Sequence, residues 1–263
     1  MSWLRALGDT GLEVSALGLG TVKLGRAEGV RYPTRFTIPD DAQAASLLAT
    51  ARALGINLID TAPAYGNSEE RLGKLLAGQR DEWVICSKVG EEFEQGVSRF
   101  DFTPEHTIAS VERSLLRLNT DVIDIVLVHS DGDDLGIIRR HGTLDALAAL
   151  RQRGLVRAIG MSTKTVEGGL EAAARSDVVM LTYNPVHRQE ETVLAECARR
   201  NKGTLIKKAL ASGHLAAAEG DSVQASMNLV FAHPGTGAAI IGTISEDHLQ
   251  ANVQAVHRAL AEN

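Results

Sequence analysis

The chain has 263 residues, of which 44% are hydrophobic and 23% are charged, and its formal net charge is −6. This mild acidity provides no basic stripe for a nucleic-acid partner, and no apolar run approaches the roughly 20 residues of a membrane span. Residues 1–6 lack the basic start and long apolar core of a signal peptide. The two cysteines, Cys86 and Cys197, have no metal-type spacing. We therefore expect no metal site and a reduced, cytoplasmic location.

The first forty residues predict a hairpin, a buried strand and a long loop. Residues 3–14 are typical of two short strands around a Gly-Asp-Thr-Gly turn. The apolar segment that follows, residues 16–21, is expected to be a buried strand. It leads into a loop at about residues 22–39, and connections of this length are usually functional or mobile. A helix then begins at an acidic cap, Asp40 or Asp41.

The remaining chain alternates regularly between strand-like and helix-like stretches. Strand-like runs occupy residues 57–59, 83–87, 123–128, 156–161, 178–182, 204–207 and 238–241. Helix-like stretches occupy residues 69–76, 104–118, 144–153, 166–175, 190–200, 221–232 and 246–260. Together with the strand at 16–19 these make eight strands, each followed by a helix, and such alternation indicates a parallel sheet covered by helices.

We accordingly predict one α/β domain over residues 1–263, a (β/α)8 TIM barrel whose N-terminal β-hairpin covers the bottom of the barrel. An open, doubly wound sheet is the competing architecture. That fold usually carries a Gly-x-Gly-x-x-Gly turn after an early strand, and residues 18–23 lack its third glycine.

Four polar side chains follow three consecutive predicted strands. Asp60 and Tyr65 come after the second strand, Lys88 ends the third, and His129 ends the fourth. Because the strand ends of a parallel barrel meet at one face, we expect these side chains to share a pocket. Each has an ordinary structural explanation when taken alone, such as a turn residue or a core histidine. A lysine at a buried rim nevertheless needs a partner, and Asp60 is the obvious candidate.

Residues 60–69, DTAPAYGNSE, together with SKVG at 87–90 and LVH at 127–129, resemble the aldo-keto reductase superfamily. Residues 17–21, 154–162, 183–185 and 241–243 extend the resemblance over almost the whole chain. It implies a reductase that passes a hydride between NADPH and a carbonyl, with a catalytic tetrad that maps onto Asp60, Tyr65, Lys88 and His129.

The chemistry of such a tetrad can be argued from its residue types. Tyr65 would be the general acid and base, and an adjacent Lys88 would lower the pKa of the phenol. Asp60 would hold Lys88 charged and oriented. His129 would bind the substrate oxygen, while the cofactor carries out the redox step.

The resemblance also implies an extended cofactor site across the strand ends, without a Rossmann turn. The positions that match it are Gly20, Thr21, Asp60, Ser162, Thr163, Lys207, Leu210, Ser212, Gly213, Gly242, Thr243, Ser245, His248 and Asn252. The chain departs from the family pattern at Thr163, where Asn is common, and at Met180, where Gln is common. Met180 cannot replace the hydrogen bonds of a carboxamide. Lysines at 207–208 stand where relatives often place an aromatic residue that stacks on the nicotinamide, and Lys207 could approach the pyrophosphate.

The expected cofactor is NADPH, with NADH as the alternative. Thr243 and Ser245 open the last helix, whose N-terminus favours an anion, and His248 could assist them in holding a 2′-phosphate. Relatives that prefer NADP place a lysine and an arginine here, whereas this chain has Gly242 and His248 at those two positions. The sequence therefore offers little positive charge here that would select NADPH over NADH.

Expected substrates are aldehydes, ketones or sugar-like carbonyls, or a sugar hydroxyl in the reverse direction. Substrate choice would depend on the long loops at 22–39 and 90–103, which carry Arg31, Tyr32, Arg35, Phe36, Phe93, Arg99 and Phe100. Arginines beside aromatic residues hint at an anionic or planar substrate, and solvated loop charges are the plain alternative. Because the chain ends with its last helix, an open and permissive pocket is expected.

A non-catalytic role is the other function to weigh. Some members of the family serve as cofactor-sensing subunits, so a tetrad alone does not prove metabolic flux. The alternative is therefore an NADP(H)-binding sensor or regulatory subunit of a larger assembly. As an enzyme, the chain is expected to act as a monomer or small homo-oligomer on a small-molecule carbonyl.

Overall fold

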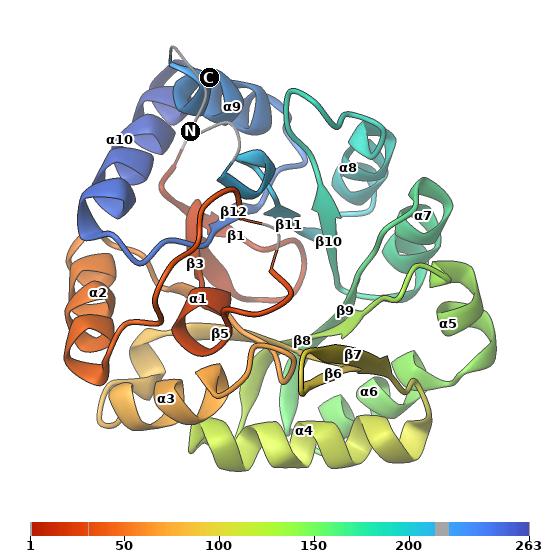
Figure 1. Cartoon of the computed structure of the whole chain (residues 1–263). Coiled ribbons are helices and arrows are strands. Elements are labelled where there is room, and N and C mark those ends of the chain that lie inside the picture. The colour runs from red at the N-terminus through yellow and green to blue at the C-terminus, as the bar shows by residue number, and fades with distance from the viewer. Residues whose placement is uncertain (1, 31, 214–220, 263) are drawn as a thin grey trace.

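The computed structural model describes residues 2–30, 32–213 and 221–262. Its parallel strands close into a barrel in the order β10-β11-β12-β3-β4-β5-β8-β9, which confirms the predicted TIM barrel and excludes the open sheet (Figure 1). The barrel strands are β3 (Leu17–Gly20), β4 (Leu58–Asp60), β5 (Val84–Val89), β8 (Ile123–His129), β9 (Val156–Ser162), β10 (Val178–Thr182), β11 (Gly203–Lys207) and β12 (Ala238–Ile241).

Helices surround the barrel on its outside (Figure 1). The predicted ones fall within two residues of their expected bounds, and they are α3 (Ser68–Leu75), α4 (Pro104–Leu118), α6 (Thr143–Gln152), α7 (Val166–Arg175), α8 (Glu191–Arg199), α9 (Ser222–Ala232) and α10 (Glu246–Glu262). Helix α2 (Asp41–Ala53) begins at Asp40, whose side chain forms a capping box with Gln43, so the acidic cap is also confirmed.

Several elements lie where the sequence predicts only loops. Residues 22–39 contain the single-turn helix α1 (Val22–Gly25), and residues 90–103 contain an antiparallel hairpin of β6 (Glu91–Glu94) and β7 (Val97–Phe100). Helix α5 (Asp134–Arg140) and the 3-10 turns η1 (Arg80–Glu82) and η2 (Ala211–Gly213) are also additional. A single turn is too short to show helical periodicity. The hairpin is largely exposed, so no apolar alternation reveals it; Gln95 and Gly96, both at positive φ, form its two-residue turn.

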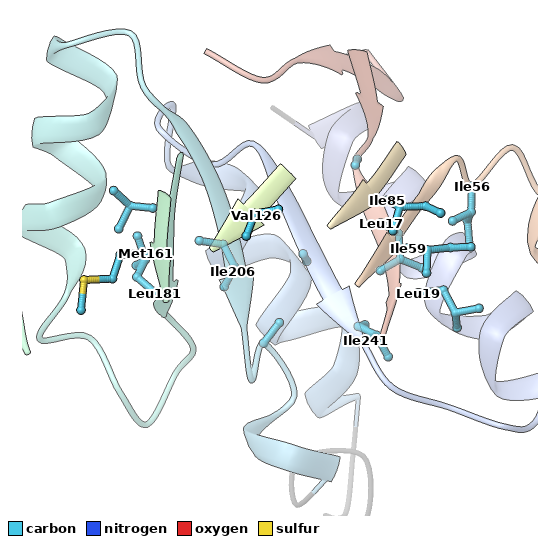
Figure 2. Packing of buried hydrophobic residues seen from close by; sticks show 14 of the residues in the cluster. Leu17, Leu19, Ile56, Ile59, Ile85, Val126, Met161, Leu181, Ile206 and Ile241 are labelled. Atoms are coloured by element: carbon cyan, nitrogen blue, oxygen red, sulfur yellow. The ribbon is translucent and has the colours of Figure 1, made fainter. Parts of the chain in front are cut away.

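Alternation along the barrel strands divides the core into two clusters. Outward-facing residues pack against the helices, as Figure 2 shows for Leu17, Leu19, Ile56, Ile59, Ile85, Val126, Met161, Leu181, Ile206 and Ile241. Inward-facing residues fill the barrel itself, and they include Leu58, Cys86, Ile125, Leu127, Ala158, Val178, Met180, Leu205 and Ala238. The barrel is therefore a packed core whose only room for chemistry is at its ends.

The N-terminal hairpin closes one end of the barrel, as predicted. Its strands β1 (Leu4–Ala6) and β2 (Glu13–Ser15) pair antiparallel. Leu7, Leu12 and Val14 belong to the inner cluster and are buried. Leu7 lies against the first residue of β11, where a Cβ on Gly203 would come within 2.6 Å of the leucine Cγ. The carboxyl ends of the strands, at the opposite end, remain available for a site.

The turn that carries Tyr65 is packed tightly against α1. A Cβ on Gly66, whose φ is +63°, would lie 2.1 Å from the carbonyl oxygen of Gly25. The guanidinium of Arg26 donates a 3.0 Å hydrogen bond to the carbonyl of Ala64. These contacts fix the backbone on both sides of Tyr65, so the phenol does not depend on a free loop for its position.

Gly66→Ala tests this packing against a matched control, Gly78→Ala. Both glycines have left-handed φ angles, but a Cβ on Gly78 meets nothing within 4 Å. Gly78→Ala should cost about 1–2 kcal/mol of unfolding free energy from its backbone conformation alone. Gly66→Ala should cost about 1–3 kcal/mol more because the methyl group overpacks the turn. Equal losses in denaturant titrations of the two variants would contradict this account.

Candidate active site

Polar side chains complete the inward face of the strands at the carboxyl ends. Asp60, Lys88, His129 and Lys207 each follow an inner-cluster residue of their strand by two positions, and Ser162 follows Ala158 by four, so all keep to the inward face. The barrel interior thus changes from apolar side chains to a ring of polar groups at the carboxyl ends of the strands. This is the mouth at which the βα loops meet.

Lys88 and Asp60 form a buried ion pair in this ring. Nζ of Lys88 lies 2.6 Å from Oδ1 of Asp60 and also donates a 2.8 Å hydrogen bond to the carbonyl of Thr61. The two residues are only 2% and 4% exposed. Burial works against the ammonium, but the charge of Asp60 raises the pKa of Lys88 above its ordinary value. Lys88 is therefore held as a cation, as the sequence predicts.

Tyr65 lies beside this cation, with Nζ of Lys88 4.8 Å from the centroid of its ring. Burial raises the pKa of the Tyr65 phenol well above its usual value, and the charge of Lys88 opposes the rise without cancelling it. The expectation that Lys88 lowers the phenol pKa is thus wrong for the net shift, although the sign of the lysine's effect is correct. The phenol keeps its proton throughout the neutral range and is ready to act as an acid.

His129 contacts a carboxylate that the sequence did not predict. Its Nδ1 lies 2.8 Å from Oε2 of Glu91, on β6, and its ring meets that of Tyr65 edge-on at 6.4 Å between centroids. Burial lowers the pKa of His129 although Glu91 opposes this effect. Burial would raise the pKa of Glu91, but its contacts with His129 and Ser98 outweigh this effect and lower the pKa to about 2. Glu91 could have been placed near His129 only by predicting the hairpin at 90–103, and the sequence of that segment lacks a clear strand pattern.

Lys207 reaches across the mouth to β9. Its Nζ donates hydrogen bonds of 2.9 Å to the hydroxyl of Ser162 and of 2.5 Å to the carbonyl of Thr163. Burial lowers the pKa of Lys207 to about 8, in part against the charge of Glu190. Thr163 is fully buried, and within the described residues its hydroxyl has no hydrogen-bond partner.

A cavity of about 570 Å³ adjoins the mouth between η2, β12 and α10. Half of the predicted cofactor positions line it, namely Leu210, Ser212, Gly213, Gly242, Thr243, His248 and Asn252. Other lining residues had not been singled out for the cofactor, among them Lys23, Tyr32, Lys208, Ala251, Ala255 and Arg258. Those on α10 recur every three or four residues and so form one face of the helix. Lys23 could have been found from its place just after the β3 strand end.

Two predicted cofactor residues, Thr21 and Ser245, use their hydroxyl groups in hydrogen bonds within the chain. The hydroxyl of Thr21 donates a 2.9 Å hydrogen bond to the carbonyl of Asp60 and so ties β3 to β4. The hydroxyl of Ser245 accepts a hydrogen bond from the backbone of His248 at the start of α10. Gly20 ends β3 opposite Asp60, at the level of the mouth, and an added Cβ there would lie 3.2 Å from Cγ2 of Ile240 and 3.5 Å from the backbone nitrogen of Gly242.

The two loop regions place their aromatic side chains against cations of this chain. Nζ of Lys23 lies 4.0 Å from the centroid of Tyr32 and 5.1 Å from that of Phe36. The guanidinium of Arg26 lies 3.3 Å from the centroid of Phe93, and Phe100 stacks on a neighbouring phenylalanine. Arg35 and Arg99 are exposed, and Arg31 lies outside the described residues.

Within residues 2–30, 32–213 and 221–262, no three His, Cys, Asp or Glu side chains gather as metal ligands would. In the same ranges no helix is long and apolar enough to cross a membrane.

Comparison with known proteins places the chain in a family. Residues 16–228 match the family model described as the aldo/keto reductase family. A solved structure of the Pseudomonas aeruginosa protein PA4992, described with the same family, is 57% identical with a TM-score of 0.90, over 98% of this chain and 95% of that one. The chain belongs to the aldo/keto reductase family, whose members are oxidoreductases.

Two curated relatives are similar over a shorter range. The aldo-keto reductase YhdN of Bacillus subtilis is 33% identical over 207 residues, which cover 76% of this chain and 60% of the relative. The L-galactose dehydrogenase of Arabidopsis thaliana is 38% identical over 166 residues, which cover 60% of this chain and 48% of the relative. The chain thus spans only about half to three fifths of the length of these two proteins.

Asp60→Asn should strongly destabilise the protein because it leaves the Lys88 cation buried without a counter-charge. The expected loss is about 3–5 kcal/mol of unfolding free energy. The double variant Asp60→Asn/Lys88→Met should recover much of it, since neither charge then remains. Denaturant unfolding of the two variants measures both values. A single variant as stable as the parent protein would show that Lys88 needs no partner.

Proposed function

We propose that this chain transfers a hydride between NADP(H) and an aldehyde, ketone or sugar carbonyl, with Tyr65 as the general acid and base. The observation that carries the proposal is the buried Lys88–Asp60 ion pair beside the Tyr65 phenol. Lys88 holds a positive charge beside the Tyr65 phenol, and the chain belongs to a family of oxidoreductases. A phenol next to a fixed cation is suited to give a proton to a substrate oxygen or to take one from it.

In the reductive direction the proton step follows from the charges of the mouth. Hydride addition to a carbonyl carbon builds negative charge on the oxygen, and Tyr65 gives its proton to that oxygen. The phenolate left behind is stabilised by the ammonium of Lys88, which Asp60 holds in place. A proton from solvent then restores the phenol. In the oxidative direction the same atoms move in reverse, and the high pKa of Tyr65 makes it a strong base once it is ionised.

The residues around the mouth and cavity fit a nicotinamide dinucleotide. NADPH, when bound, supplies the hydride. Ser162 and Lys207 offer a hydroxyl and an ammonium at the inner mouth, where a carboxamide would be held. Gly242 and Tyr32 line the cavity side by side, and a Cβ on Gly242 would come within 2.6 Å of Oη of Tyr32. Asn252 and Thr243 provide polar groups for the adenosine end.

Positive charge in the cavity favours the phosphorylated cofactor. Besides His248, the lining includes three cations, Lys23, Lys208 and Arg258, and one carboxylate, Asp221, so its net charge is positive. The phosphates of NADPH carry four or more anionic oxygens. An arginine side chain can bind a phosphate with two parallel N–H donors. We therefore infer NADPH rather than NADH.

The proposal extends to the setting of the enzyme. We infer one barrel domain over residues 1–263, acting as a monomer or small homo-oligomer in the reducing cytoplasm. Cys86 and Cys197 are both free and buried, which suits a chain that needs no disulfide. The similarity to a galactose dehydrogenase supports a polyhydroxylated substrate.

Tyr65→Phe tests the assignment of the acid. The variant removes the transferable proton and leaves the ring, so turnover of a simple aldehyde should fall at least about 100-fold. Binding of NADPH, measured by fluorescence titration, should stay within a factor of about two because the cavity is untouched. Turnover close to that of the parent protein would sink the assignment. A parallel loss of cofactor binding would show a structural role instead.

Arg258→Met tests the source of the NADPH preference, with the exposed Arg175→Met on α7 as control. Losing a charged hydrogen bond costs about 1.5 kcal/mol or more, so the affinity for NADPH should fall about tenfold. The affinity for NADH should change little, because NADH lacks the third phosphate. Titration of both nucleotides into both variants measures the difference. Equal weakening of NADPH and NADH would remove Arg258 from the 2′-phosphate site.

A further inference from the structure

The hairpin β6–β7 brings one carboxylate into the mouth and holds it there. Oε1 of Glu91 accepts a 2.6 Å hydrogen bond from the hydroxyl of Ser98, on the opposite strand of the hairpin. A guanidinium nitrogen of Arg26 lies 3.9 Å from the same oxygen. At the base of the hairpin, Gly90 has a φ of +99° and packs so closely on Phe102 that a Cβ would come within 2.6 Å. The carboxylate is thus supported by both strands of the hairpin and by Arg26, the residue that follows α1.

The other oxygen of Glu91 faces His129, and this contact decides where the imidazole carries its proton. Nδ1 lies 2.8 Å from Oε2, which is hydrogen-bond distance. Burial would raise the pKa of Glu91, but its contacts with His129 and Ser98 lower that pKa to about 2, so the carboxylate is ionised at neutral pH. Nδ1 forms no hydrogen bond of acceptable angle among the described residues. At 2.8 Å, however, an N–H is attracted to the anion and a lone pair is repelled by it, so the charge of Glu91 favours the proton on Nδ1. In the neutral imidazole the other nitrogen, Nε2, is then an acceptor, and it becomes a donor only in the imidazolium.

We propose that Glu91 is a positioning residue that keeps the proton of His129 on Nδ1. When His129 is neutral, its Nε2 then accepts a hydrogen bond from an alcohol substrate. Only when His129 is protonated does Nε2 donate a hydrogen bond to a carbonyl. This inference rests on the proposed function, because it assigns the ligand of Nε2 to the substrate oxygen. It makes the two directions of the reaction depend on opposite protonation states of one side chain.

The charges around His129 set the pH at which this choice is made. Burial lowers its pKa first, Glu91 raises it, and Lys88 and Lys207 lower it further. Tyr65 meets its ring and keeps its own proton. Because the resulting pKa lies below the ordinary histidine value, His129 is neutral at pH 7. Alcohol binding is then favoured at and above neutrality, and carbonyl reduction gains as the pH falls towards the pKa of His129.

Nitrogen NMR of the imidazoles tests the proton position without any turnover. The chain has eight histidines, and the His129 signals are those that disappear in His129→Gln. At pH 8 we expect the chemical shifts of an imidazole with its proton on Nδ1. A neutral His129 with its proton on Nε2 would overturn the inference, whatever the enzyme proves to catalyse.

The pH dependence of turnover tests the effect of the charge. Glu91→Gln removes the carboxylate and lowers the pKa of His129, so the limb of kcat/KM for carbonyl reduction should move towards acid by about one pH unit. Glu94→Gln, an exposed residue on the same strand, loses the same charge and should leave the profile in place. Alcohol oxidation above pH 8 should change less than reduction at neutral pH in Glu91→Gln.

An unshifted reduction profile in folded Glu91→Gln would also overturn the inference. That outcome would leave the proposed function intact, since Tyr65 would still transfer the proton. Conversely, full activity of Tyr65→Phe would remove the proposed function while the imidazole spectrum still reported the Glu91 contact. The two sets of measurements therefore fail independently.

Discussion

The ion pair between Lys88 and Asp60 is the constraint on which the rest of the mouth depends. Two opposite charges that are nearly excluded from solvent are stable only in contact, because either one alone would be buried without compensation. Their contact fixes the ends of β4 and β5 relative to each other. It also places a permanent cation under Tyr65, so the electrostatics of the phenol follow from a requirement of folding.

Burial then acts in opposite senses on the two neighbours of that pair. It raises the pKa of Tyr65, whose charged form is an anion, and lowers the pKa of His129, whose charged form is a cation. Both side chains are therefore neutral near pH 7. Under the proposed function, Tyr65 then holds the proton for the substrate oxygen, and Lys88 and Glu91 would stabilise the phenolate and the imidazolium, respectively.

Much of this arrangement could be predicted from the sequence, because it is encoded in periodic strands. Asp60, Lys88 and His129 stand at strand ends whose apolar runs are easy to recognise, and barrel geometry brings such ends together. Glu91 could not be predicted, because its hairpin is exposed and lacks a burial pattern. The net shift of the Tyr65 pKa was also beyond the sequence, since it depends on how much solvent the packed turn excludes.

The residues of the proposed cofactor site were likewise predicted only in part. The positions at Gly242, His248 and Asn252 were predicted from a resemblance, and they do line one cavity with others from η2. The cations Lys23 and Arg258 were missed, because one lies in a single-turn helix and the other lies six residues beyond Asn252 on α10. A helix face repeats its side chains every three or four residues, so only the observed cavity identifies which turn of α10 takes part.

The central claim is direct hydride transfer at the mouth, and isotope transfer measures it most directly. NADPH carrying deuterium at C4 would be incubated with an aldehyde and the enzyme, and the alcohol product analysed by mass spectrometry. The account predicts one deuterium on the carbinol carbon of the product, delivered from one face of the nicotinamide. Product without deuterium from either labelled epimer, or no product with any aldehyde, ketone or sugar, would contradict it.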